Sequence, residues 1–360
     1  MASISVQTKG VAQTRVAGYP ADSLRFDLVS VILSLWFMAG LFLDGWAHNH
    51  VAELETFFTP WHGVLYTGYF AVAGLIAFTQ MRNVSRGYAW SRALPKGYFL
   101  SLVGVVLFFF GGGGDMLWHE IFGVEQNAEA LFSPTHLLLA TGAILFLTGP
   151  LRAAWMRAKS AAEGWRELLP AIVSLAMLFS FFTFFTQYAN ILSTPSVLVD
   201  RPTGNSYFYN VTAISYILYP AAIMMGVILF ALRRWHLPFG ALTFTFTANA
   251  IAMVLMRFDF ASEYGLIIGA AFLAGLVADF LNTRGQPSVE RPAALRLFAF
   301  AVPFVYFLLA LAAITVAEGR GLWWAVHMWT GVPFMAGAIG VSLSFLLAPP
   351  ALPAAEVETS

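Results

Sequence analysis

The sequence predicts an all-α, polytopic membrane protein with about ten transmembrane helices and both termini in the cytoplasm. Apolar residues make up 59% of the 360 residues and charged residues only 11%, whereas an ordinary soluble domain carries about 25% charged residues. Long apolar segments recur along the chain, and each reaches the roughly 20 residues that a membrane-spanning helix needs. Lys and Arg gather on one side of these segments, which sets the orientation of the helices.

Ten segments have the length and composition of a span. They are residues 26–48, 60–81, 97–119, 134–156, 168–190, 208–232, 239–257, 264–282, 293–316 and 323–347. This alternation leaves residues 1–24 and 349–360 as tails on the same side. Of the 19 basic residues, all but Arg201, Arg257 and Arg320 fall on that side, which we assign to the cytoplasm. The expected location is the cell (inner) membrane, as a multi-pass protein.

Composition also excludes several kinds of partner and cofactor. The net charge is zero, so nothing indicates a nucleic-acid partner. The chain has no cysteine, which excludes disulfides, thiolate metal sites, iron–sulfur clusters and covalently attached haem. A metal would have to be held by histidine, carboxylate, methionine or backbone oxygen. The expected partners are the lipid bilayer and, as an open alternative, other membrane subunits or further copies of the chain.

A pattern of four potential metal ligands occurs twice near the predicted outer face. The two copies are Asp44, His48, Glu55 and His62, and Asp115, His119, Glu129 and His136. In each copy three residues separate Asp from the first His, which places both side chains on one face of a helix, one turn apart. Consecutive spans are antiparallel, so the second His begins at the depth where its Asp and first His end. The pattern therefore predicts two metal sites.

The residues before each second histidine fix its direction. Thr59 and Ser133 suit the N-cap of the following helix, and Pro60 and Pro134 suit its first position, where a missing N–H costs nothing. The histidine then lies in the first helical turn. The glutamate has three possible roles, as a ligand, as a partner that fixes a histidine tautomer, or as a carboxylate favoured by the helix dipole. The alternative to a metal site is that these side chains are polar caps at the membrane interface.

Residues 25–158 are expected to form a four-helix unit with the duplicated motif, supported by a six-helix unit over residues 159–348. We expect His48, His62, His119 and His136 to point towards a common interior. A set of His and carboxylate ligands without sulfur suits copper, with zinc, iron and manganese as alternatives.

The duplicated stretch resembles the metal-binding stretch of the C subunit of copper membrane monooxygenases, the methane and ammonia oxidisers. The resemblance lies in Asp44 and His48 followed by Phe-Thr-Pro-Trp-His over 58–62, and in Asp115 and His119 followed by Phe-Ser-Pro-Thr-His over 132–136. It implies copper or a related divalent metal on Asp44, His48 and His62, and on Asp115, His119 and His136.

Two functions follow from different classes of protein. The first is a membrane metalloprotein that could act as an oxidase or hydroxylase of a small lipophilic substrate, with Trp46, Trp61, Trp118 and Phe132 shaping an apolar pocket. The second is a transporter or metal-delivery protein, since ionisable residues within a membrane also mark ion paths. The sequence also allows a transmembrane b-type haem site or a purely structural role.

Overall fold

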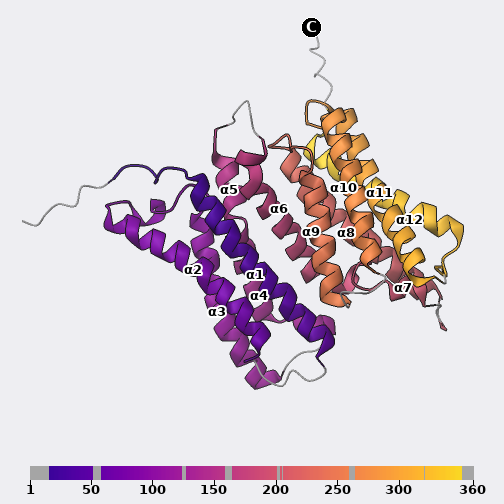
Figure 1. Cartoon of the computed structure of the whole chain (residues 1–360), viewed down its shortest axis with the longest axis horizontal. Helices are drawn as coiled ribbons and strands as arrows, with labels where there is room; N and C mark the ends of the chain where they lie inside the picture. The colour runs from indigo at the N-terminus through magenta and orange to yellow at the C-terminus, as the bar shows by residue number, and fades with distance from the viewer. Residues whose placement is uncertain are drawn as a thin grey trace, which may run out of the picture.

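A computed structural model shows a chain built from helices. It describes residues 16–51, 58–123, 127–158, 164–200, 203–204, 206–258, 264–319 and 321–350, and contains no β-strand within those ranges. The long helices are α1 (Leu24–His50), α2 (Pro60–Ser85), α3 (Phe99–Phe122), α4 (Pro134–Leu147), α6 (Trp165–Phe185), α8 (Ser206–Leu232), α9 (Ala241–Arg257), α10 (Gly265–Gly285), α11 (Pro292–Glu318) and α12 (Val326–Leu347) (Figure 1). The shorter ones are α5 (Gly149–Met156), α7 (Ser196–Val199), η1 (Trp90–Arg92), η2 (Asn127–Leu131) and η3 (Gln187–Ala189).

The described helices are those of a polytopic membrane protein. By length and composition, 8 of them can cross a membrane, and up to 9 spans result when α4 and α5 are counted as one. The predicted span 134–156 is bent by 40° between these two helices, where Pro150 in the first turn of α5 interrupts the helical hydrogen bonds. Helix α9 has only 17 residues. The count of ten spans therefore stays a prediction.

Local sequence explains where the first helices begin. The Ser23 hydroxyl accepts a hydrogen bond from the Phe26 backbone N–H at the start of α1. The Thr59 and Ser133 hydroxyls do the same for the N–H groups of His62 and His136, each at 3.1 Å. Both prolines occupy the first turn. The predicted caps are confirmed, and they place each histidine in the first turn of its helix.

Glycines bring the helices of each hairpin into close contact. A Cβ atom at Gly68 would lie 2.7 Å from the Phe37 Cα, and a Cβ atom at Gly142 would lie 2.7 Å from the Phe108 backbone nitrogen. Helix α2 is thereby fitted against α1, and α4 against α3. These contacts join matching positions of the two repeated stretches, because Phe37 and Phe108 each lie seven residues before the aspartate of their own copy.

An aromatic cluster holds α1 to α4 together. Phe37, Tyr69, Phe108 and Phe146 supply one ring from each helix. The Phe37 ring lies 5.4 Å from that of Phe108 and 4.9 Å from that of Phe146, both edge to face. Tyr69 stacks on Phe108 at 4.6 Å, and its hydroxyl donates to the Val105 carbonyl at 2.9 Å. This geometry is favourable for aromatic pairs, and all four side chains are buried.

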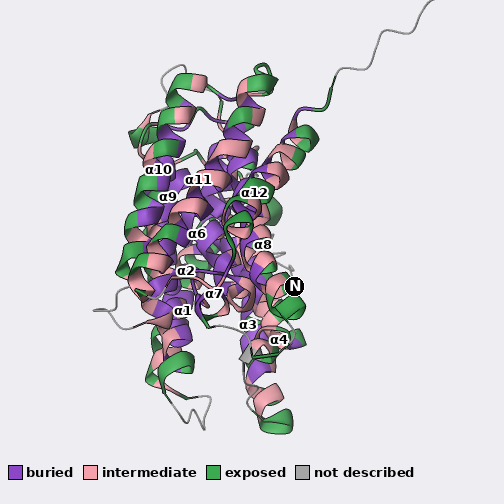
Figure 2. Cartoon of the chain, turned by 90° about the vertical axis from the view of Figure 1, so that its right-hand side faces the viewer, coloured by how far each residue is buried: buried purple, intermediate pink, exposed green. Residues whose placement is uncertain are grey.

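Helix α6 lies at the centre of the molecule and connects the two halves. In its most apolar stretch 78% of the residues are buried, against 33–50% in the other spans, and Figure 2 shows it within the buried interior. Helices α8 to α12 pack beyond it (Figure 1).

Asp279 of α10 is fully buried and accepts hydrogen bonds from the backbone N–H groups of Leu242 and Thr243. This carboxylate caps the start of α9, where it meets the positive end of the helix dipole.

A second buried carboxylate lies at the start of α1. Asp27 is 1% exposed, accepts a hydrogen bond from the Tyr98 hydroxyl at 2.7 Å and pairs with Arg157. Arg234 donates to the carbonyl of Arg157, so the segments that follow α5 and α8 meet the start of α1 at this end. Arg257 is one of the three basic residues predicted on the opposite side. It donates a hydrogen bond to the Asn49 side chain, at the far end of α1.

We predict that Gly68→Ala destabilises the protein by about 1–3 kcal/mol, because the added methyl meets the backbone of α1 and the helices must separate. Gly74→Ala in the same helix is the control, since nothing lies within 4 Å of a Cβ there. It gains helix propensity of about 0.5–1 kcal/mol without a clash. Unfolding of the purified protein in mixed detergent micelles, followed by circular dichroism, measures both. Equal stability of the two variants would contradict the close packing.

Candidate metal centre

The first candidate centre joins the end of α1 to the start of α2. The Nε2 atom of His62 lies 3.4 Å from an Asp44 carboxylate oxygen, and the Nε2 atom of His48 lies 3.8 Å from the same oxygen. Asp44 is nearly buried, with 9% exposure. The spacing of four residues along α1 puts Asp44 and His48 on one face, and the cap at Thr59 turns His62 towards them.

The second centre joins α3 to α4 in the same way. The Nε2 atom of His119 lies 3.4 Å from one oxygen of Asp115, and the Nδ1 atom of His136 lies 3.3 Å from the other. Asp115 is 3% exposed. In both centres a buried carboxylate is thus flanked by two imidazoles, one from its own helix and one from the next.

The two triads have closely matching geometry. In each, one ligand atom from every residue lies within 4.8 Å of the others. The histidine rings are separated by 6.0 Å and 70° in the first triad and by 5.9 Å and 67° in the second. Three nitrogen and oxygen donors converging from two helices could hold a divalent transition metal and leave a position for a further ligand.

Neighbouring groups orient the histidines. The Thr59 hydroxyl lies 3.2 Å from His62 Nδ1, and the Ser133 hydroxyl lies 2.7 Å from His136 Nδ1. His119 Nδ1 lies 3.3 Å from the Gly123 carbonyl. For His62 and His119 this contact engages the nitrogen that faces away from the aspartate, so Nε2 is directed into the triad. Such contacts fix ring direction and raise ligand basicity at metal sites.

Two features distinguish the centres: His62 faces its aspartate through Nε2 but His136 through Nδ1, and the residue before each second histidine differs. The Thr135 hydroxyl donates to Asp115 at 2.8 Å, whereas the matching position in the first copy is Trp61, which packs edge to face on Trp46 at 5.7 Å. The second carboxylate therefore has a hydroxyl donor that the matching position of the first copy does not supply.

Of the two predicted glutamate ligands, the structure describes only Glu129. Glu129 is exposed in η2 and is outside the two groups of converging ligands in the described chain. Glu55 lies outside the described residues. His50 ends α1, where its ring stacks on that of Trp46 at 4.9 Å.

Sequence reasoning did not identify Tyr66 or Thr135 as part of the site. Tyr66 follows His62 by four residues, with ring centres 6.3 Å apart, and a Cβ atom at Gly112 of α3 would lie 3.0 Å from its hydroxyl. The signals were the helical spacing from His62 for Tyr66 and, for Thr135, a hydroxyl directly before the second histidine.

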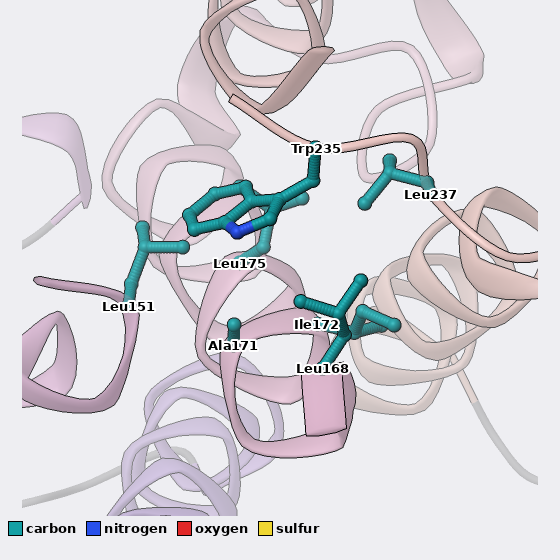
Figure 3. A pocket seen from close by; sticks show the side chains of 7 residues that line it. All are labelled: Leu151, Leu168, Ala171, Ile172, Leu175, Trp235 and Leu237. Carbon is teal, nitrogen blue, oxygen red and sulfur yellow. The ribbon is translucent and has the colours of Figure 1, made fainter. Parts of the chain in front are cut away.

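Two cavities lie near α6. The larger, of about 700 Å³, runs between α1, α6 and α9 and is lined by apolar side chains and Ser180, with Trp46 and Trp61 among them. The smaller, of about 10 Å³, lies where Leu151, Leu175 and Trp235 face one another (Figure 3). It has room for about one water molecule at most, so only the larger cavity suits a ligand.

We predict that Thr135→Val, which keeps the side-chain shape, destabilises the protein by about 1.5–3 kcal/mol, because a carboxylate loses a hydrogen-bond donor. The control is Thr141→Val in the same helix, whose exposed hydroxyl bonds only the preceding turn and is expected to change stability by less than about 0.5 kcal/mol. Denaturation in detergent measures the difference. A Thr135→Val variant as stable as the control would show that this hydroxyl does not support Asp115.

Comparison with protein-family models, with curated proteins and with solved structures finds no match to this chain. The centre is therefore interpreted from its own geometry.

Proposed function

We propose that this protein is an integral membrane metalloprotein that binds copper, or another divalent metal such as zinc, iron or manganese, at two sites. Asp44, His48 and His62 hold the first metal, and Asp115, His119 and His136 hold the second. The observation that carries the proposal is the recurrence of one triad geometry on two separate helix pairs. Interfacial caps would account for polar residues at helix ends, but not for two carboxylates each flanked by two histidines.

The chemistry of the donors supports a transition metal. Imidazole nitrogen suits copper, zinc and iron, and a carboxylate adds the charge that favours a divalent ion. The near-complete burial of Asp44 and Asp115 makes each carboxylate costly without a compensating positive charge. The resemblance to copper membrane monooxygenases favours copper first, and a duplication of one hairpin would account for the matched positions.

We further propose that the triads face the exterior or periplasm. The support is that Asp27, Arg157 and Arg234 meet at one end of the molecule, while both triads lie at the opposite end of α1 and α3. Basic residues concentrate on the cytoplasmic side of membrane proteins.

A reaction proposed for this site is oxidation or hydroxylation of a small lipophilic substrate. The supporting observation is the apolar cavity of about 700 Å³, a volume within the usual range for small-molecule sites. Trp61 lines this cavity and directly precedes His62 in the chain. A bound metal would supply the redox chemistry, while Asp44, His48 and His62 would position it.

Transport of the metal is less well supported. A path through the four-helix unit would need polar groups at depth, but the rings of Phe37, Tyr69, Phe108 and Phe146 fill its centre. Asp279, a possible acceptor elsewhere, is engaged by the backbone of α9.

We predict that the purified protein carries about two equivalents of transition metal and that His62→Ala and His136→Ala each lose about one, because each triad keeps only two ligands. His50→Ala is the matched control, since this exposed histidine lies on α1 outside the triad. Elemental analysis by mass spectrometry measures the content. Less than about half an equivalent of any transition metal, unchanged in both variants, would overturn the proposal.

The proposed orientation predicts which introduced cysteines an external reagent can label. The chain has no cysteine of its own, so any labelling comes from the introduced residue. Ser206 and Ser85 are both exposed and lie on opposite sides of the membrane in our orientation. On intact cells an impermeant maleimide should label Ser206→Cys, and Ser85→Cys only after lysis. The reverse pattern would place the triads at the cytoplasmic face.

A further inference from the structure

The two triads approach each other along the contact between α2 and α3. Tyr66 extends from α2, one turn beyond His62, and its hydroxyl lies against Gly112 of α3, one turn before Asp115. The rings of Tyr66 and Tyr69 both contact the ring of Phe108 on α3, at centroid separations of 6.2 and 4.6 Å. A side chain of the first hairpin thus connects the ligand set of one triad to that of the other.

This contact depends on two residues, Tyr66 and Gly112, that differ from their counterparts in the other copy. At the position of Tyr66 the second copy has Ala140, and at the position of Gly112 the first copy has Leu41. A tyrosine fits here because the facing residue has no side chain. The two hairpins are therefore packed directly against each other near their metal ligands.

The charged groups of the two triads also interact. The Asp44 carboxylate is within electrostatic range of Asp115. When these imidazoles are protonated, the charge of His48 is likewise within electrostatic range of His119 and His136 of the second triad and of His62 of its own. Because Asp44 and Asp115 are buried, the interaction between their charges is weakened less than it would be on an exposed surface.

The charges decide the sign of the coupling. With neutral imidazoles each triad carries one negative charge, from its carboxylate, and a bound divalent cation changes that charge to plus one. The first cation relieves the repulsion between two carboxylates and is attracted by the second triad. The second cation must bind beside a site that is already positive. The same coupling applies whichever triad is filled first, because linkage between two sites is reciprocal.

We infer that the two triads form one coupled pair that takes up divalent cations in sequence, the first tightly and the second more weakly. This inference rests on the proposed metal binding and adds to it that the sites regulate each other. At a limiting metal supply the protein would carry one ion, which leaves the other triad for a second ion or for a ligand of different charge.

The test is a calorimetric titration of the full-length protein in lipid nanodiscs with Zn²⁺ as the probe. The wild type should show two steps whose dissociation constants differ by at least about tenfold, since the neighbouring charge reverses sign between the steps. Two double variants each retain one triad and both aspartates: His119→Ala with His136→Ala, and His48→Ala with His62→Ala. Each should bind one ion with an affinity within about threefold of the first wild-type step.

Two independent sites of unequal affinity give a different result. One double variant would then bind as weakly as the second wild-type step, which would overturn the coupling and leave metal binding itself intact. A wild-type protein that binds no Zn²⁺, Cu²⁺ or Co²⁺ would instead overturn the proposed function.

A single conservative change gives a second readout if a double variant fails to fold. Asp115→Asn keeps the shape of the side chain and every histidine but removes the neighbouring negative charge. It should weaken binding at the first triad at least about threefold relative to the first wild-type step. An unchanged affinity at Asp44, His48 and His62 would show that the two sites do not interact.

Discussion

The close approach of antiparallel helices through glycine is the contact on which the rest of the site depends. Gly68 and Gly142 let the backbone of one helix rest on that of its partner, which fixes the depth and rotation of each pair. At one end of each pair, an aspartate and a histidine one turn apart then meet the first-turn histidine of the next helix. A looser hairpin would separate donors that must lie within a few ångströms of one metal.

The same frame carries two centres whose surroundings differ. On the helices that carry the first triad, Trp46 and Trp61 pack on each other and line a large apolar cavity. The second has a threonine hydroxyl directed at it. Tyr66 has no aromatic counterpart in the second hairpin. The two triads are thus alike in their ligands and unlike in the residues around them.

Much of the fold could be predicted because the length of each apolar segment and the polar residues that end it are local properties of the sequence. All ten predicted segments contain helix, and Thr59 and Ser133 cap as expected. The bend at Pro150 and the burial of Asp27 and Asp279 could not be predicted, since they depend on which helices pack together. Asp279 lies in the last turns of α10, yet the start of α9 covers it. The triads followed from spacing within helices. The same spacing puts Tyr66 one turn from His62, but its contact with Gly112 depends on which hairpins pack together.

The most direct test of the metal sites is an anomalous difference map, recorded at the copper edge from crystals of the full-length protein grown with Cu²⁺. The account predicts density at Asp44, His48 and His62 and at Asp115, His119 and His136, within about 2.0–2.3 Å of each ligand atom. Density held only by other residues, with none at either triad, would contradict it.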